Sequence, residues 1–144
     1  MNINEDVKLI IKKIILEGTQ QERLALFTFN NKMPVEKILF KFNLFINAYF
    51  IRYLKNKSAP FHDEMIRNLI KSYRGENYIN LAFRGSAKSS YAKLFLVFVL
   101  LNDEDRFRKY IKIISRDLKN PKQIVTDVYN MCLELKWLYG DVFE

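Results

Sequence analysis

Glycine and proline are scarce in this chain, and their positions constrain its fold more than any other feature. The 144 residues include four glycines and three prolines, whereas an average protein uses about 7% and 5%. Because these residues interrupt regular structure, nearly every one of them is expected to mark the end of an element. Apolar side chains recur at helical spacing between them, which predicts amphipathic helices. The expected helices span residues 2–17, 24–29, 34–55, 60–73, 88–101 and 121–136.

Two short apolar runs lack helical spacing and predict β-strands. Residues 78–83 read Tyr-Ile-Asn-Leu-Ala-Phe, and residues 110–115 read Tyr-Ile-Lys-Ile-Ile-Ser. Both have strand length, the second is rich in β-branched residues, and Gly85 interrupts the chain shortly after the first. Strand, glycine loop, helix, strand and helix follow in the order of a right-handed βαβ unit, which we expect over residues 78–136.

The charge balance of the chain favours an anionic partner. Lysine and arginine total 24 against 16 acidic residues, which gives a formal net charge of +8. Such a balance is typical of proteins that bind nucleic acid, here through a surface patch because the basic residues are spread along the chain. The densest basic cluster could contact a DNA backbone or form a solvated rim, and both interpretations stay open. It comprises Arg106, Arg108, Lys109, Lys112, Arg116, Lys119 and Lys122.

Cysteine, histidine and the apolar segments exclude several classes of protein. Cys132 and His62 are the single cysteine and histidine, so neither a disulfide framework nor a His/Cys zinc site is expected. The N-terminus lacks the basic start of a secretory signal, and the apolar stretch 38–54 contains Lys41 and Arg52. We therefore expect a cytoplasmic protein without a membrane span. Aromatic residues at helical spacing in that stretch are expected in the core: Phe42, Tyr49, Phe50 and Tyr53.

The turn between the first expected strand and the following helix resembles a phosphate-binding loop. Residues 82–90 read Ala-Phe-Arg-Gly-Ser-Ala-Lys-Ser-Ser, and the Walker A pattern is G-x-x-x-x-G-K-[ST]. The lysine and the following hydroxyl match, whereas Ala82 and Ala87 occupy the two glycine positions. Ala87 adds only a methyl group, although a positive φ at that position would cost about 1 kcal/mol.

The loop retains the groups that bind phosphate, although both glycines of the pattern are replaced. Backbone N–H groups at a helix N-terminus attract phosphate oxygens, and any residue supplies them. Lys88 would contact the β- and γ-phosphates, and the Ser89 hydroxyl would join the Mg²⁺ shell. The alternative is that Lys88 and Ser89 only begin a helix, with Ser86 as its N-cap. A cation at a helix N-terminus is unfavourable unless an anion shares the site, which favours the phosphate interpretation.

Three blocks of sequence carry a resemblance to a known family. The chain resembles the N-terminal ATPase region of the large terminase subunit of tailed bacteriophages. The blocks that carry the resemblance are residues 61–65 (Phe-His-Asp-Glu-Met), 83–90 and 113–117 (Ile-Ile-Ser-Arg-Asp). Members of this family are motors that package DNA, and their loops often lack a glycine. The resemblance covers about residues 61–144, while the helices before it resemble only loosely the variable N-terminal lead of the family.

The resemblance implies a set of site residues with ATP and Mg²⁺ as cofactors. Arg84 would be the phosphate-facing arginine that stabilises charge on the γ-phosphoryl group, and its alternative is a solvated loop charge. Phe61 and His62 stand where related ATPases place an aromatic residue and a glutamine against adenine, although a core-facing Phe61 with a surface His62 stays open. Ser89 would be the metal ligand. The complete expected nucleotide site is Phe61, His62, Arg84, Gly85, Ser86, Ala87, Lys88, Ser89 and Ser90.

Together these features predict an α/β fold. A helical N-terminal lead, residues 1–58, is expected to precede the first βαβ part of a P-loop NTPase domain, residues 59–144, with a parallel sheet in a three-layer arrangement. The expected function is ATP-driven packaging of double-stranded DNA into the procapsid. The implied partners are duplex DNA, the small terminase subunit, the portal and further copies of the full-length chain, in the cytoplasm of a bacterial host.

We expect the chain to be a fragment, and its own catalysis is an open question. The family needs a second acidic motif, an apolar run that ends in Asp-Glu, to organise Mg²⁺ and the attacking water. No such run is found, since Asp117 follows a polar pair and lacks a following glutamate. The family's nuclease domain is also missing. A helicase-type P-loop ATPase and a small basic DNA-binding or assembly protein without enzymatic activity are the alternatives.

Overall fold

Helices dominate the computed structural model. It describes residues 4–54, 59–76, 87–105, 112–114 and 119–140, of which 79% are helical. Within these residues no β-strand occurs, and one isolated bridge joins Phe29 to Asp103. A π-helical turn (η1) and a 3₁₀ turn (η2) extend α3. The helices are α1 (Glu5–Glu17), α2 (Gln20–Phe27), α3 (Val35–Phe45), η1 (Ile46–Phe50), η2 (Ile51–Tyr53), α4 (Pro60–Tyr73), α5 (Lys88–Asn102), α6 (Lys119–Glu134) and α7 (Lys136–Tyr139).

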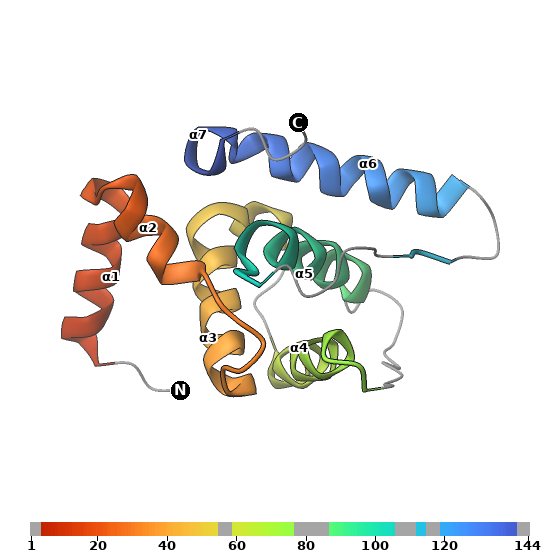
Figure 1. Cartoon of the computed structure of the whole chain (residues 1–144), viewed down its shortest axis with the longest axis horizontal. Helices are drawn as coiled ribbons and strands as arrows, with labels where there is room; N and C mark the ends of the chain where they lie inside the picture. Colours follow the sequence, from red (N-terminus) through yellow and green to blue (C-terminus); the bar gives the residue numbers. More distant parts are fainter. Residues whose placement is uncertain (1–3, 55–58, 77–86, 106–111, 115–118, 141–144) are drawn as a thin grey trace.

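Helix α5 is the centre of the structure. Figure 1 shows α6 and α7 on one side of α5 and α4 on the opposite side, with α3 beside it, and α5 contacts α3, α4 and α6. Its apolar side chains point in most directions, as expected for a helix that is buried on most faces. Its buried residues are Tyr91, Leu94, Phe95, Val97, Phe98, Val99 and Asn102.

Aromatic side chains fill the core around α5. The ring of Phe98 stacks on Phe29 at 4.9 Å between centroids and meets Phe42 edge to face at 5.5 Å. Such pairs stabilise a core beyond the apolar area that they bury. Phe42 and Phe50 are fully buried, and Tyr49 and Tyr53 pack against the core as half-buried residues. The prediction that this aromatic stripe belongs to the core is confirmed.

The predicted α/β fold with a parallel sheet is wrong, because helices bury the core of the described structure. Helix α5, expected to cover a sheet, is enclosed by α3, α4 and α6 instead. The first predicted strand, residues 78–83, lies outside the described residues, as does most of the second. The described part of the second, residues 112–114, forms neither helix nor strand, and Ile114 is 79% exposed. A buried strand would have covered that side chain.

Several helix ends were predicted correctly and others shift. Helix α4 begins at Pro60, and Gly18 follows the last residue of α1. The expected 34–55 helix changes to the π and 3₁₀ turns after Phe45. Helix α2 begins earlier than expected because Thr19 and Glu22 form a capping box. Helix α6 begins at Lys119 and precedes the short α7.

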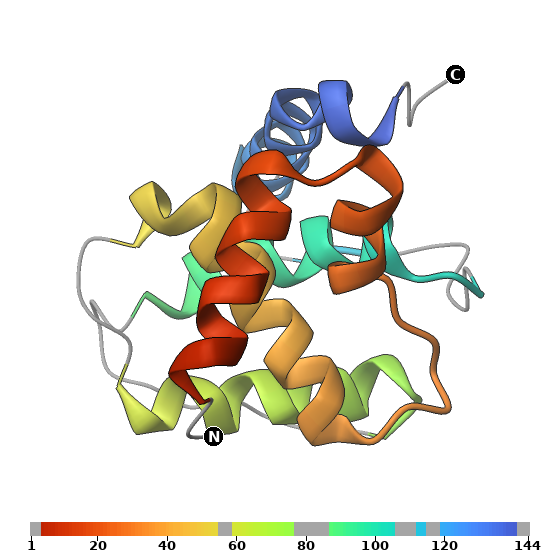
Figure 2. The same ribbon diagram turned by 90° about the vertical axis from the view of Figure 1, so that its left-hand side faces the viewer.

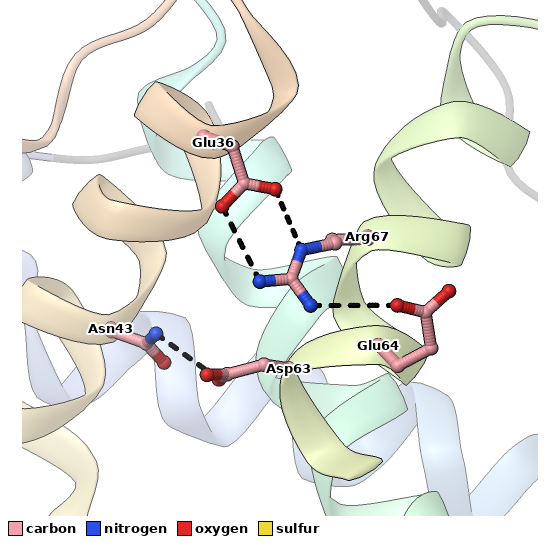
Figure 3. A network of polar contacts seen from close by, with 5 residues as sticks. All are labelled: Glu36, Asn43, Asp63, Glu64 and Arg67. Carbon is pink, nitrogen blue, oxygen red and sulfur yellow. Dashed lines mark hydrogen bonds and ion pairs between the residues drawn. The ribbon is translucent and has the colours of Figure 1, made fainter. Parts of the chain in front are cut away.

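Polar contacts join α3 to α4 (Figure 3). Glu36 accepts two hydrogen bonds from the Arg67 guanidinium, at 2.6 Å from Nε and 3.3 Å from Nη2. Arg67 also contacts Glu64, and Asn43 donates to Asp63 at 3.4 Å. The Arg67 contact lowers the pKa of the Glu36 carboxyl. These contacts lie between α3 and the first two turns of α4, whose first turn carries Phe61 and His62.

The N-terminal helix α1 is the outermost layer of the fold (Figure 2). It has no buried residue, and it lies over α3 with a groove of about 320 Å³ between them. The core joins residues on both sides of position 58, from Phe27 to Leu135. The division into a lead of residues 1–58 and a domain of residues 59–144 stays a prediction. In the part of the chain that is described, no helix is long and apolar enough to cross a membrane.

Candidate nucleotide-binding site at the start of helix α5

The residue before α5 adopts the backbone conformation that a phosphate-binding loop reserves for glycine. Ala87 has φ 59° and ψ 16°, in the left-handed region, and is the single non-glycine residue with positive φ among those described. An L-residue pays about 1 to 2 kcal/mol for this conformation. The sequence pattern places a glycine at this position, immediately before the lysine. Ala87 therefore has the positive φ at which an alanine backbone is strained.

The first turn of α5 presents cationic and hydroxyl groups to solvent. Lys88 and Ser89 are exposed, Ser90 is half-buried, and the Tyr91 N–H donates to the Ala87 carbonyl oxygen at 3.0 Å. No acidic residue occurs in this turn, and within the described residues no side chain caps it. The positive end of the helix dipole thus coincides with a lysine.

The two residues that resemble an adenine-binding pair lie beside this turn. His62, from the first turn of α4, stacks on Tyr91 of α5 with the ring centroids 4.5 Å apart. The Phe61 ring is 4.0 Å from that of His62. The His62 Nδ1 accepts a hydrogen bond from the Ala59 N–H at 2.8 Å, which fixes the ring. The fold therefore brings together residues 61–62 and the start of α5, which are far apart in the sequence.

Burial separates the roles of Phe61 and His62. His62 is 8% exposed and Phe61 is 39% exposed. The structure thus reverses the alternative in which Phe61 faces the core and His62 the surface. The Phe61 ring is therefore the more exposed of the two, and it lies against the buried His62 ring.

A small pocket lies beside Ser90 of the same turn. It has a volume of about 270 Å³ and lies between Tyr53, Ser90 and Lys93 on one side and α6 on the other. Lys93 donates to Asp127 of α6 at 2.5 Å, and Gln123 donates to the same carboxylate at 2.7 Å. These hydrogen bonds lower the pKa of Asp127. Sequence reasoning missed this pair because nothing local in either helix signals it.

The remaining expected site residues lie outside the described residues. These are Arg84, Gly85 and Ser86, and Asp117, which was not expected to be part of the site, also lies outside them. No group of three or more His, Cys, Asp or Glu side chains that could hold a metal is found in the described ranges. Mg²⁺ in phosphate sites commonly keeps water and phosphate ligands, so the exposed hydroxyl of Ser89 is compatible with it. Of the basic cluster, Lys112, Lys119 and Lys122 are described, and all three are exposed.

Comparison with protein-family models, curated proteins and solved structures gives no match for this chain. The resemblance to terminase large subunits is thus untested by relatives. The local geometry at the start of α5 is what bears on function.

Proposed function

We propose that this chain binds the phosphate groups of ATP, with Mg²⁺, at the start of helix α5. The observation that carries the proposal is the left-handed backbone of Ala87 directly before Lys88. A left-handed residue followed by right-handed ones turns successive N–H groups toward one point, which forms a concave anion site. Natural chains retain such strain mainly where function requires it.

The chain's own residues would divide the binding work. The backbone N–H groups of the first turn would donate to phosphate oxygens, and the Lys88 ammonium would neutralise their charge. The Ser89 hydroxyl would be a ligand of Mg²⁺, which supplies further charge neutralisation when it is bound. The exposed ring of Phe61, supported by His62, would stack on the base. Arg84, Gly85 and Ser86 would complete the loop.

The proposal extends from nucleotide binding to a biological role, and the sequence resemblance supports this extension. In that role the chain would be the ATP-binding portion of a terminase large subunit, with duplex DNA, the small subunit and the portal as partners in a bacterial cytoplasm. The net charge of +8 supports an anionic partner. The exposed Lys112, Lys119 and Lys122 could contribute to that contact.

A fluorescent ATP analogue, titrated with Mg²⁺ into the full chain, tests the proposal. We expect Lys88→Ala to abolish binding, because in the proposed site the Lys88 ammonium would contact the β- and γ-phosphates. Lys122→Ala is the matched control, since Lys122 is also an exposed lysine in the first turn of a helix. Equal loss in both variants would indicate nonspecific charge attraction. Undiminished binding by Lys88→Ala would refute the site.

A basic DNA-binding protein without catalysis is the second candidate, favoured by the helical fold and the exposed lysines. It predicts DNA affinity that falls steeply with salt and is indifferent to Lys88→Ala. Measuring duplex DNA binding of the same two variants at several salt concentrations separates the candidates. If the nucleotide site exists, Lys88→Ala should lower the affinity for ATP but not the affinity for DNA.

A further inference from the structure

A groove of about 320 Å³ lies between the outermost helix α1 and the continuous helical segment of α3 and η1 (Figure 2). Among the described helices, α1 packs mainly on α2 and has only slight contact with α3, which leaves this space between them. On the α1 side, the lining residues have the spacing of a single helix face. The lining consists of Lys8, Ile11, Lys12, Ile15 and Leu16 on one side and Leu44, Asn47 and Ala48 on the other. We call this space the α1 groove.

The walls of the α1 groove are largely apolar and open to solvent. None of the lining residues is buried, and Leu16 is 65% exposed. A ligand that covers apolar surface of this kind is stabilised by the hydrophobic effect. Asn47 and Ala48 belong to the π turn η1, and π turns within helices are frequent at functional sites. The α1 groove is therefore a candidate site for an apolar ligand.

The volume and polarity of the groove limit what it can hold. One turn of an α-helix with its side chains is about 10 Å across and 5.4 Å long, so it fills roughly 400 Å³, which is more than the groove offers. An extended peptide is slimmer, but its N–H and C=O groups need hydrogen-bond partners. Asn47 is the single uncharged polar residue of the lining. A hydrocarbon chain is slim and needs no such partners, so the groove favours a single acyl chain.

Two lysines make one edge of the α1 groove positive. Lys8 and Lys12 lie one helical turn apart, and the acids of α1, which are Glu5, Asp6 and Glu17, do not line the groove. Lys8 forms an ion pair with Glu5 at 2.6 Å, in which both side chains are more than half exposed, and such surface pairs are weak. Lys12 is exposed, and its side chain has no ion pair or hydrogen bond within the described residues. The Lys12 ammonium is therefore available to an anionic head group.

We infer that the α1 groove binds a fatty acid, which is a single hydrocarbon chain with a carboxylate head group. The carboxylate would bind the Lys12 ammonium, with Lys8 beside it, and the hydrocarbon chain would extend along α1 towards Leu16. From Lys8 to Leu16 the α1 side is about 12 Å long at 1.5 Å per residue, which suits a fatty acid of medium length. A phospholipid would leave its second chain outside the groove. This site shares no residue with the start of α5 and is independent of the proposed nucleotide site.

Isothermal titration calorimetry of the whole protein with two amphiphiles tests the inference. Dodecanoate and dodecyltrimethylammonium have the same hydrocarbon tail but opposite head-group charge, and both are used below the concentrations at which they form micelles. We expect one dodecanoate to bind per protein, at least about tenfold more tightly than the cationic amphiphile. Equal affinity for the two amphiphiles, or no binding of dodecanoate, overturns the inference. Binding of vesicles of anionic phospholipid without binding of dodecanoate also overturns it, since α1 would then contact a membrane surface instead.

Substitutions of exposed residues on α1 locate the site without removing core packing. Lys12→Ala should weaken dodecanoate binding about tenfold, and Leu16→Ser should weaken it about threefold or more. Lys13→Ala is the matched control, because Lys13 is also exposed on α1 but does not line the groove, and it should leave binding unchanged. Circular dichroism verifies that each variant is folded. Equal weakening by Lys12→Ala and Lys13→Ala would indicate nonspecific charge attraction and overturns the inference, as does binding that neither Lys12→Ala nor Leu16→Ser weakens.

Discussion

Replacing Ala87 by glycine should leave the stability of the protein nearly unchanged or raise it, although it removes a side chain that packs against the core. The left-handed backbone at φ 59° costs an alanine about 1 to 2 kcal/mol, which glycine does not pay. Glycine also makes the unfolded chain more flexible than alanine does, and losing this extra flexibility on folding costs about 0.5 to 1 kcal/mol. Ala87 is half-buried, so the lost methyl costs roughly 0.4 kcal/mol, half of a fully buried group. The terms sum to a change between about 0.4 kcal/mol against glycine and about 1 kcal/mol in favour of glycine.

The matched comparison is Ala87→Val, in which a β-branched side chain must adopt the same left-handed backbone. We expect valine to destabilise by about 1 to 2 kcal/mol, since branching at Cβ makes this region still less accessible. Urea unfolding of wild type and both variants, followed by circular dichroism, measures the differences. If the valine variant were the most stable of the three proteins and the glycine variant the least stable, the strained conformation at Ala87 would be refuted. The phosphate site would then lose its principal support.

Three further predictions concern burial and charge. Phe98→Ala should cost about 3 to 5 kcal/mol in urea unfolding, because Phe98 is fully buried against Phe29 and Phe42. Burial raises the pKa of the Cys132 thiol to about 11, so a thiol reagent at pH 8 should modify it only after denaturation, and rapid native reaction would contradict its burial. The pKa of Asp127 is lowered by Lys93 and Gln123, so the carboxylate stabilises the fold above its unfolded pKa and loses this effect as pH falls through the folded pKa. The stability difference between wild type and Asp127→Asn should therefore shrink from pH 6 toward pH 3, and a constant difference would contradict the ion pair.

The helices could be predicted because their signals are local. Pro60 begins α4, Lys88 begins α5 and Gly18 ends α1 as the sequence indicates. Each signal depends on backbone geometry within a few residues. The break after Phe45 was missed because apolar residues continue at nearly helical spacing through the π turn. Periodicity alone does not distinguish an α-helix from its wider and tighter variants.

The fold class could not be predicted, because it depends on which distant segments bury one another. Short apolar runs of six residues are compatible with a buried strand and with other structures. The strand interpretation of residues 110–115 required burial of Ile114, which is exposed. The apolar surface of α5, expected to face a sheet, is covered by α3, α4 and α6. Nothing in the local sequence of α5 specifies that choice.

The local features of the candidate site could be predicted from the sequence, and the contacts between its helices could not. The lysine and the hydroxyl follow from a loop pattern within a few residues, whereas the positive φ at Ala87 was only a condition that the structure then met. The contact of His62 with Tyr91 joins α4 to α5, and the Lys93–Asp127 ion pair joins α5 to α6. Both depend on how the helices pack, which only the structure gives. The buried position of His62 follows from the same packing.

The absence of a sheet in the described structure removes the fold analogy but not the local chemistry on which the proposed phosphate site depends. Phosphate binding at a helix start needs aligned N–H groups, a cation and a backbone turn, and none of these requires a particular fold. What it does require is a helix start that cannot shift when the anion binds. Helix α5 meets this requirement because Tyr91 and Leu94 are buried within two turns of Lys88. The strain at Ala87 persists for the same reason, since the packing of α5 fixes where the preceding residue must turn.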